Sequence, residues 1–226
     1  MRFFSPNFER EGIGIERDDV IEYTFISFIK LLIDKFWILV KLNLLFILFS
    51  IPVVTIPASL GALNSITMLL VQRKHVFLLH DFITKFKENW KQSTVCFTIL
   101  GILFSLSLFC LNLYFSIGQI NKIFLILFFI TLSILFFISI TSLYVYPLIT
   151  TISLSTIYIL KNSILLSIVC MKNSICGLIV FTFFLLNSFI FFYFSFPINL
   201  LIGFSLASFV NSFITFPCIN KYIVIN

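Results

Sequence analysis

Long uncharged stretches alternate with short basic ones along most of the chain. Residues 42–71, 94–118, 123–146 and 173–220 contain no charged side chain. A helix crosses the hydrocarbon core of a bilayer, about 30 Å thick, with about 20 apolar residues. Each stretch is therefore long enough for one crossing or two, and the pattern predicts an all-α, polytopic transmembrane helical bundle.

Three further segments lie outside these stretches. Two of them carry apolar residues at helical spacing, and the third is apolar but interrupted by lysine. Residues 20–33, within an N-terminal cytoplasmic segment 1–35, predict an amphipathic helix on the membrane surface. Residues 72–93 predict a basic cytoplasmic loop helix. Residues 148–172, broken by Lys161 and Lys172, predict an interfacial segment within the bundle 94–226, although a buried helix there is an alternative.

Two prolines divide the first apolar stretch. Pro52 and Pro57 lie near its middle, and each removes a helical hydrogen bond and disfavours helix in the residue before it. Residues 36–71 therefore predict a short, proline-broken transmembrane hairpin. Two alternatives stay open: one long kinked crossing, or a re-entrant loop that enters and leaves on the same side.

The remaining crossings follow from charge and proline positions. Residues 94–118 and 123–146 predict two spans joined by a short link with Lys122, the second ended by Pro147, and residues 173–220 predict two spans turning at Pro197. With about six crossings, fourteen of the fifteen basic residues lie on one side. The positive-inside rule then predicts a multi-pass protein of the cytoplasmic membrane with both termini in the cytoplasm.

Composition excludes several classes of protein. Apolar residues make up 60% of the chain, charged residues 11%, and the mean hydropathy is +1.14. A soluble domain is about 25% charged, so a soluble enzyme or nucleic-acid module is excluded. No carboxylate side chain occurs from Asn89 to Asn226, which argues against a proton-coupled carrier. The sequence predicts no catalytic residue, metal site, cofactor or nucleic-acid partner.

The basic loop helix is the candidate interaction surface. Phe82, Phe86 and Trp90 follow one another at intervals of four residues and fall on one line down the helix. Lys85, Lys87 and Lys91 flank that line. Such a helix is typical of a contact with anionic lipid or of docking on a cytoplasmic partner.

Part of the sequence resembles a known family. The stretch K-F-W-I-L-V-K-L-N-L-L-F-I-L-F-S-I-P-V-V-T-I-P-A-S-L-G-A-L (35–63) is similar to the N-terminal signature of the YesL family of bacterial integral membrane proteins. The family's cytoplasmic loop resembles D-F-I-T-K-F-K-E-N-W-K-Q-S (81–93) of this chain. A Gly-x-Gly segment of the longer family members resembles R-E-G-I-G-I-E-R-D (10–18).

The resemblance implies a function but no site. Family members are commonly encoded beside carbohydrate-uptake transporters, and no catalytic residues are assigned to them. The chain is therefore expected to be a non-enzymatic accessory or component of carbohydrate uptake in a bacterium, with the lipid bilayer and carbohydrate ABC transporter subunits as partners. The alternatives are a small-solute carrier with a neutral path of Ser, Thr and Asn side chains, or a membrane scaffold or regulator.

Overall fold

The computed structural model describes residues 24–119, 121–152, 154–190 and 192–224. Within these ranges the regular elements are all helices, without a strand, which confirms the predicted all-α fold class. The polar N-terminal segment before residue 24, including the Gly-x-Gly at residues 12–14, lies outside the described residues. The elements, in chain order, are α1 (Phe25–Ser50), the 3-10 turn η1 (Val53–Thr55), α2 (Ile56–Val71), α3 (Leu78–Gly118), α4 (Ile123–Thr151), α5 (Thr156–Val169), α6 (Met171–Ile190), α7 (Phe192–Ile198), the π-helical turn η2 (Asn199–Gly203), α8 (Phe204–Ile219) and the π-helical turn η3 (Asn220–Val224).

Helix α1 joins two segments that the sequence analysis separates. The predicted surface helix and the first half of the predicted hairpin form one helix of 26 residues. No proline or glycine occurs between residues 25 and 50, so nothing ends the helix where its polarity changes. The predicted segment boundary at residue 35 is therefore wrong as a helix boundary, because α1 continues through it.

The two prolines lie where α1 ends and α2 begins. Pro52 takes an extended conformation between α1 and η1, and Pro57 lies in the first turn of α2, where its missing N–H costs nothing. At the other end of α2, Arg73 adopts a left-handed conformation (φ 56°), and Arg73 and Lys74 donate their N–H groups to Leu70 and Leu69. This is the closing turn in which glycine is most common.

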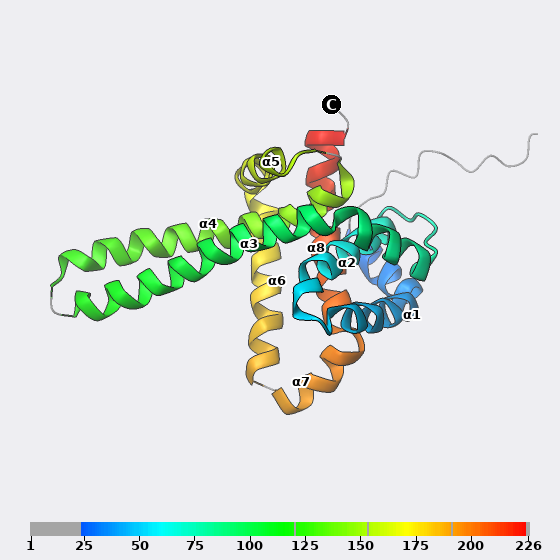
Figure 1. The fold of residues 1–226 in the computed structure, drawn as a ribbon, viewed down its shortest axis with the longest axis horizontal. Helices are drawn as coiled ribbons and strands as arrows, with labels where there is room; N and C mark the ends of the chain where they lie inside the picture. Colours follow the sequence, from blue (N-terminus) through cyan, green and yellow to red (C-terminus); the bar gives the residue numbers. More distant parts are fainter. Residues whose placement is uncertain (1–23, 120, 153, 191, 225–226) are drawn as a thin grey trace, which may run out of the picture.

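Helix α3 is the longest element, and it corrects the prediction of a loop helix followed by a separate span. Its 41 residues run without interruption from the polar segment 78–93 into the apolar segment 94–118. At 1.5 Å per residue it is about 60 Å long. It lies side by side with α4, and the two form a hairpin whose tip projects well beyond the other helices (Figure 1).

Helix α4 also corrects a prediction, because Pro147 does not end it. The helix continues to Thr151 with Pro147 inside it. Proline has no N–H to donate to the carbonyl four residues earlier, that of Leu143. The side-chain amide of Asn211 on α8 donates to this carbonyl instead, at 2.9 Å.

The C-terminal part begins with a sharp elbow. Helix α5, within the predicted interfacial segment, and α6 meet at an angle of 99° around Cys170. Helices α6 and α8 then run alongside each other, connected through α7 and η2, as the two predicted spans require. Pro197 lies inside α7, in this connection.

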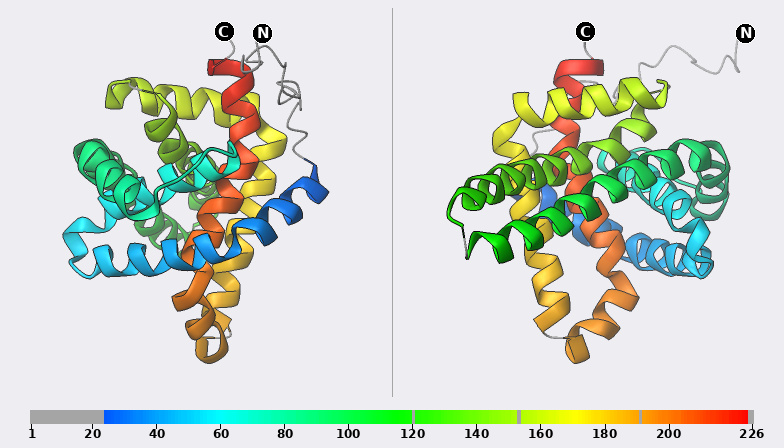
Figure 2. Two further views of the ribbon diagram at one scale, coloured as in Figure 1. Left: turned by 90° about the vertical axis from the view of Figure 1, so that its right-hand side faces the viewer. Right: turned by 60° about the vertical axis from the view of Figure 1, so that its left-hand side comes forward.

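In the part of the chain that the structure describes, four helical stretches are long and apolar enough to cross a membrane: Val53–Val71, Leu78–Gly118, Ile123–Thr151 and Phe196–Ile223. The bent pair α5–α6 would make a fifth. Helix α1 is not among them, because Asp34, Lys35 and Lys41 interrupt it. The α3–α4 hairpin runs across α6 and α8 in Figure 1 and in the right-hand view of Figure 2. The helices of a simple bundle of six crossings would all follow one direction, and these helices do not.

Helix α2 is the centre of the packing. It contacts α1, α3, α4 and α8, and nearly all of its residues are buried. Small residues such as Ala58, Gly61 and Ala62 let the surrounding helices approach it closely. The core is completed by large side chains from these neighbours, among them Leu39, Phe82, Tyr144 and Phe209.

Candidate functional site

The predicted interaction surface lies on the polar half of α3. The helix starts at Leu78, and Asp81 in its first turn accepts a hydrogen bond from the N–H of Phe77 at 2.8 Å. An acidic residue at this end favours the helix because it complements the helix dipole. His75 and His80 are both exposed nearby. Within the described ranges, no three His, Cys, Asp or Glu side chains gather so as to hold a metal ion.

The predicted aromatic line is not one exposed surface. Phe82 is fully buried and Phe86 is half-buried, and both rings pack against Phe49 at the end of α1, with centroids 5.3 and 5.4 Å apart. These two side chains hold α3 against α1. The prediction that Phe82 contacts lipid or a partner is wrong, because its ring is fully buried, whereas Phe86 keeps part of its surface exposed.

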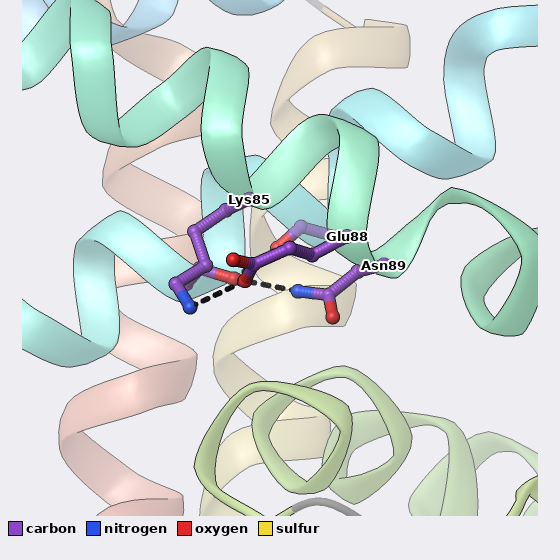
Figure 3. A network of polar contacts seen from close by, with 5 residues as sticks. Lys85, Glu88 and Asn89 are labelled. Carbon is purple, nitrogen blue, oxygen red and sulfur yellow. Dashed lines mark hydrogen bonds and ion pairs between the residues drawn. The ribbon is translucent and has the colours of Figure 1, made fainter.

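Trp90 differs from the other two aromatic residues, since 47% of its surface is exposed. Lys87 and Lys91 beside it are exposed as well. Lys85 pairs with Glu88 at 2.7 Å on the surface, which leaves this pair neutral (Figure 3). The basic surface that remains consists of Lys87, Trp90 and Lys91.

The opposite side of the same segment is tied to α2. Asn89 donates to the hydroxyl of Ser65 at 3.3 Å, and Ser65 donates to the carbonyl of Gly61 at 2.8 Å. Gly61 faces Ser93 so closely that a Cβ at position 61 would overlap the Ser93 hydroxyl. Further along α3, Gln92 donates to the carbonyl of Leu154 in the link between α4 and α5, at 2.6 Å. The hydrogen bonds of Asn89 to α2 and of Gln92 to the α4–α5 link therefore fix the position of Trp90, which lies between them in the sequence.

Trp90 and Lys91 mark the point where α3 changes from polar to apolar. The helix from Lys91 to Gly118 is about 40 Å long at 1.5 Å per residue. A bilayer with its headgroups measures about 40–45 Å. Trp side chains and the ends of Lys side chains prefer the headgroup region. The geometry therefore suits an interfacial anchor at residues 87–91, with Lys122 at the other interface.

The fluorescence of Trp90 tests this placement directly. The chain has two tryptophans, so a Trp37→Phe variant leaves Trp90 as the single reporter. In nanodiscs with brominated lipids, bromines near the headgroup should quench Trp90 more than bromines deep in the acyl chains. Replacing Lys87 and Lys91 by Glu should reduce that quenching in anionic bilayers, whereas Lys122→Glu should not. Quenching by a water-soluble quencher alone would contradict the anchor.

Asparagine side chains form a second set of polar contacts, inside the helix packing. The amide of Asn43 on α1 donates to the carbonyls of Asn199 and Leu200 at 3.1 and 2.8 Å, and its oxygen accepts from the N–H of Ser205 at 3.0 Å. Asn173 donates to the carbonyl of Ile214 in the Pro217-containing part of α8. Asn43 and Asn211 thus bind backbone groups where a helix departs from regular α geometry, at η2 and at Pro147.

Hydroxyl groups continue this polar seam. Thr67 on α2 is hydrogen-bonded to Ser208 and Ser212 on α8, at 3.0 and 2.9 Å, and all three are buried. Such contacts between helices stabilise packing in an apolar environment. The sequence predicts that Asn43 and Asn211 face other helices, because an asparagine is costly in lipid, but it does not give their partners. For Asn211, Pro147 was an available signal, since a proline inside an apolar helix requires a substitute donor.

The fold and these surfaces define a class: an all-α protein whose apolar helices mark it as a membrane protein. The family model described as "Protein of unknown function, DUF624" matches residues 39–113, about a third of the chain. The match extends from the second half of α1 through η1 and α2 to most of α3, and so includes both prolines and Trp90. No curated protein and no solved structure matches the chain.

Proposed function

We propose that this protein is a non-enzymatic accessory subunit of a bacterial carbohydrate-uptake system. The DUF624 match over residues 39–113 is consistent with the YesL-like signature at residues 35–63. That resemblance supports a partner among carbohydrate ABC transporter subunits. The proposed location is the cytoplasmic membrane, with both chain termini in the cytoplasm.

The observation that favours an accessory over a carrier is the bonding of the interior polar groups. A solute path needs side chains that are free to bind a passing molecule. The interior amide of Asn43 and the hydroxyls of Thr67 and Ser212 are instead bonded to other helices. They serve to hold α1, α2 and α8 together.

The charge distribution supports the proposed orientation. Lys161, Lys172 and Lys221 are all exposed. They belong to α5, the start of α6 and the region after α8, which lie at one end of the molecule (Figure 1). By the positive-inside rule, this end faces the cytoplasm. The tip of the α3–α4 hairpin, which carries Lys122, lies away from this end (Figure 1).

A solute carrier is the second candidate, because one cavity includes hydroxyl groups. The cavity of about 510 Å³ lies between the α3–α4 hairpin and α6, and Ser139, Ser142 and Thr182 contribute to its mainly apolar lining. Ser139 and Ser142 donate to backbone carbonyls of their own helix, at 2.8 and 2.7 Å. This bonding leaves the cavity better suited to an apolar group than to a sugar.

Two measurements separate the candidates. An accessory should co-purify with permease and ATP-binding subunits of a sugar transporter when it is isolated from native membranes in mild detergent. Purified alone and placed in liposomes, it should move no labelled sugar. Sugar flux through the purified chain would establish the carrier, and a native preparation without transporter subunits would contradict the accessory. A scaffold or regulator would instead co-purify with other membrane proteins.

A further inference from the structure

The cavity beside the α3–α4 hairpin lies where α4 and α6 diverge. The two helices meet at one point, where the hydroxyls of Tyr144 and Ser174 are hydrogen-bonded at 2.9 Å. One turn further along α6, a Cβ at Gly177 would lie 3.1 Å from the side chain of Leu143. Because the hairpin runs across α6, the helices separate beyond this contact (Figure 1). The cavity of about 510 Å³ occupies the space between them, with Leu143 in its lining.

Hydrogen bonds to α8 fix both walls of this cavity. On the α4 side, the amide of Asn211 donates to the carbonyl of Leu143 at 2.9 Å. On the α6 side, Asn173 donates to the carbonyl of Ile214 on α8 at 3.1 Å. The separation of α4 and α6 is therefore set by contacts outside the cavity, so the walls do not close on each other to fill it.

The lining excludes water and sugars as the main occupants. Its side chains are Leu and Phe except for Ser139, Ser142 and Thr182, and both serine hydroxyls already donate to carbonyls of α4. A buried water takes about 30 Å³ and needs two to four polar partners. Close-packed protein interiors contain few voids larger than one water. A space of this size and chemistry therefore fits a flexible apolar molecule.

The cavity opens onto the surface that faces lipid. Phe104 on α3, Leu132 on α4 and Leu185 on α6 line it and are 41%, 44% and 56% exposed. The apolar parts of α3 and α4 are candidate membrane spans of which only 11% is buried inside the chain. The rim of the cavity is thus continuous with the surface in contact with the bilayer, and the hydrocarbon chain of a lipid can enter it from the side.

We propose that this cavity is a binding site for one acyl chain of a bilayer phospholipid. Its volume lies within the range of about 300–1,000 Å³ that is typical of ligand sites, and such sites are mainly apolar. A chain bound there contacts α4 and α6 together and supports the hairpin at its angle to α6. The proposal concerns this cavity alone and does not depend on the accessory function.

Two serines on α4 give matched variants for the test. Ser139 lines the cavity, whereas Ser133 is exposed outside it, and each hydroxyl donates to the carbonyl four residues earlier. Ser139→Trp should fill the cavity, and Ser133→Trp should place the same side chain on the open surface. Thr182→Phe fills the cavity from α6 and so provides a second blocked variant on another helix.

The experiment uses the full chain in phosphatidylcholine nanodiscs in which a small fraction of the lipid carries a photoreactive diazirine midway along one acyl chain. After irradiation, mass spectrometry of the digest locates the adducts. Wild-type protein and Ser133→Trp should carry adducts on the cavity residues of both α4 and α6. Both blocked variants should lose these adducts but keep those on the open face of α3, for example at Phe109, which is 65% exposed. Wild-type protein without cavity adducts, or equal cavity labelling in all four proteins, would overturn the proposal.

Discussion

Replacing Gly61 by valine is expected to lower the stability of the protein by about 2–3 kcal/mol, the usual cost of inserting bulk into a packed core. A Cβ at position 61 overlaps the hydroxyl of Ser93 and lies 3.3 Å from the Ser93 Cβ. Valine therefore forces α2 away from α3 at the tightest point of their contact. The midpoint of thermal unfolding in detergent should fall by roughly 5–10 °C for a chain of this length.

The matched control is the same substitution on an open face. Gly101 lies in the apolar half of α3, and no atom lies within 4 Å of a Cβ built there. Gly101→Val should leave the melting midpoint unchanged or raise it, since glycine is a poor helix former. Adding Ser93→Ala to Gly61→Val should recover part of the loss. Equal effects at positions 61 and 101 would show that α2 and α3 do not pack closely at Gly61.

Replacing Asn43 by leucine should cost about 3 kcal/mol, because three hydrogen bonds disappear at a fully buried site. The Asn43 amide is fully buried and binds two carbonyls and one N–H where η2 meets α8. Leucine has a similar volume but neither donates nor accepts. Circular dichroism of the protein unfolding in mixed micelles should show the lower free energy of unfolding. On a size-exclusion column, a smaller fraction of the variant should elute as a single species.

Asn112 supplies the control for this prediction. It is exposed on the apolar half of α3 and makes no side-chain hydrogen bond within the described part of the chain. Asn112→Leu removes an amide from a surface suited to lipid, so it should be neutral or stabilising. If both leucine variants behave alike, the contribution of Asn43 is not its hydrogen bonding.

The helical content and the proline break could be predicted from the sequence, whereas the helix boundaries could not. The change from polar to apolar residues near position 93 looks like a boundary because the environment changes there. A helix ends for backbone reasons, however, and no proline or glycine lies between residues 78 and 100. The same reasoning explains α1. Local polarity predicts where a helix lies in its environment and says little about where it stops.

The surface and the polar seam depend on contacts that are distant in sequence. Burial of Phe82 requires Phe49, which comes from another helix. Continuation of α4 through Pro147 requires Asn211, 64 residues further along the chain. An amphipathic pattern identifies an apolar face but does not tell whether lipid or protein covers it. The lysines beside Trp90 were predictable because their position on the surface follows from charge alone.

The continuity of α3 has a mechanical consequence. A hinge needs a break or a few residues that can absorb a change in backbone angles, and α3 has none between its polar start and the hairpin tip. Any rotation applied to its polar end is therefore transmitted as torque along about 60 Å of helix. Contacts through Asn89 and Gln92 bring α2 and the α4–α5 link into the same rigid body. A ligand that turned this end would turn the hairpin tip at Lys122 with it.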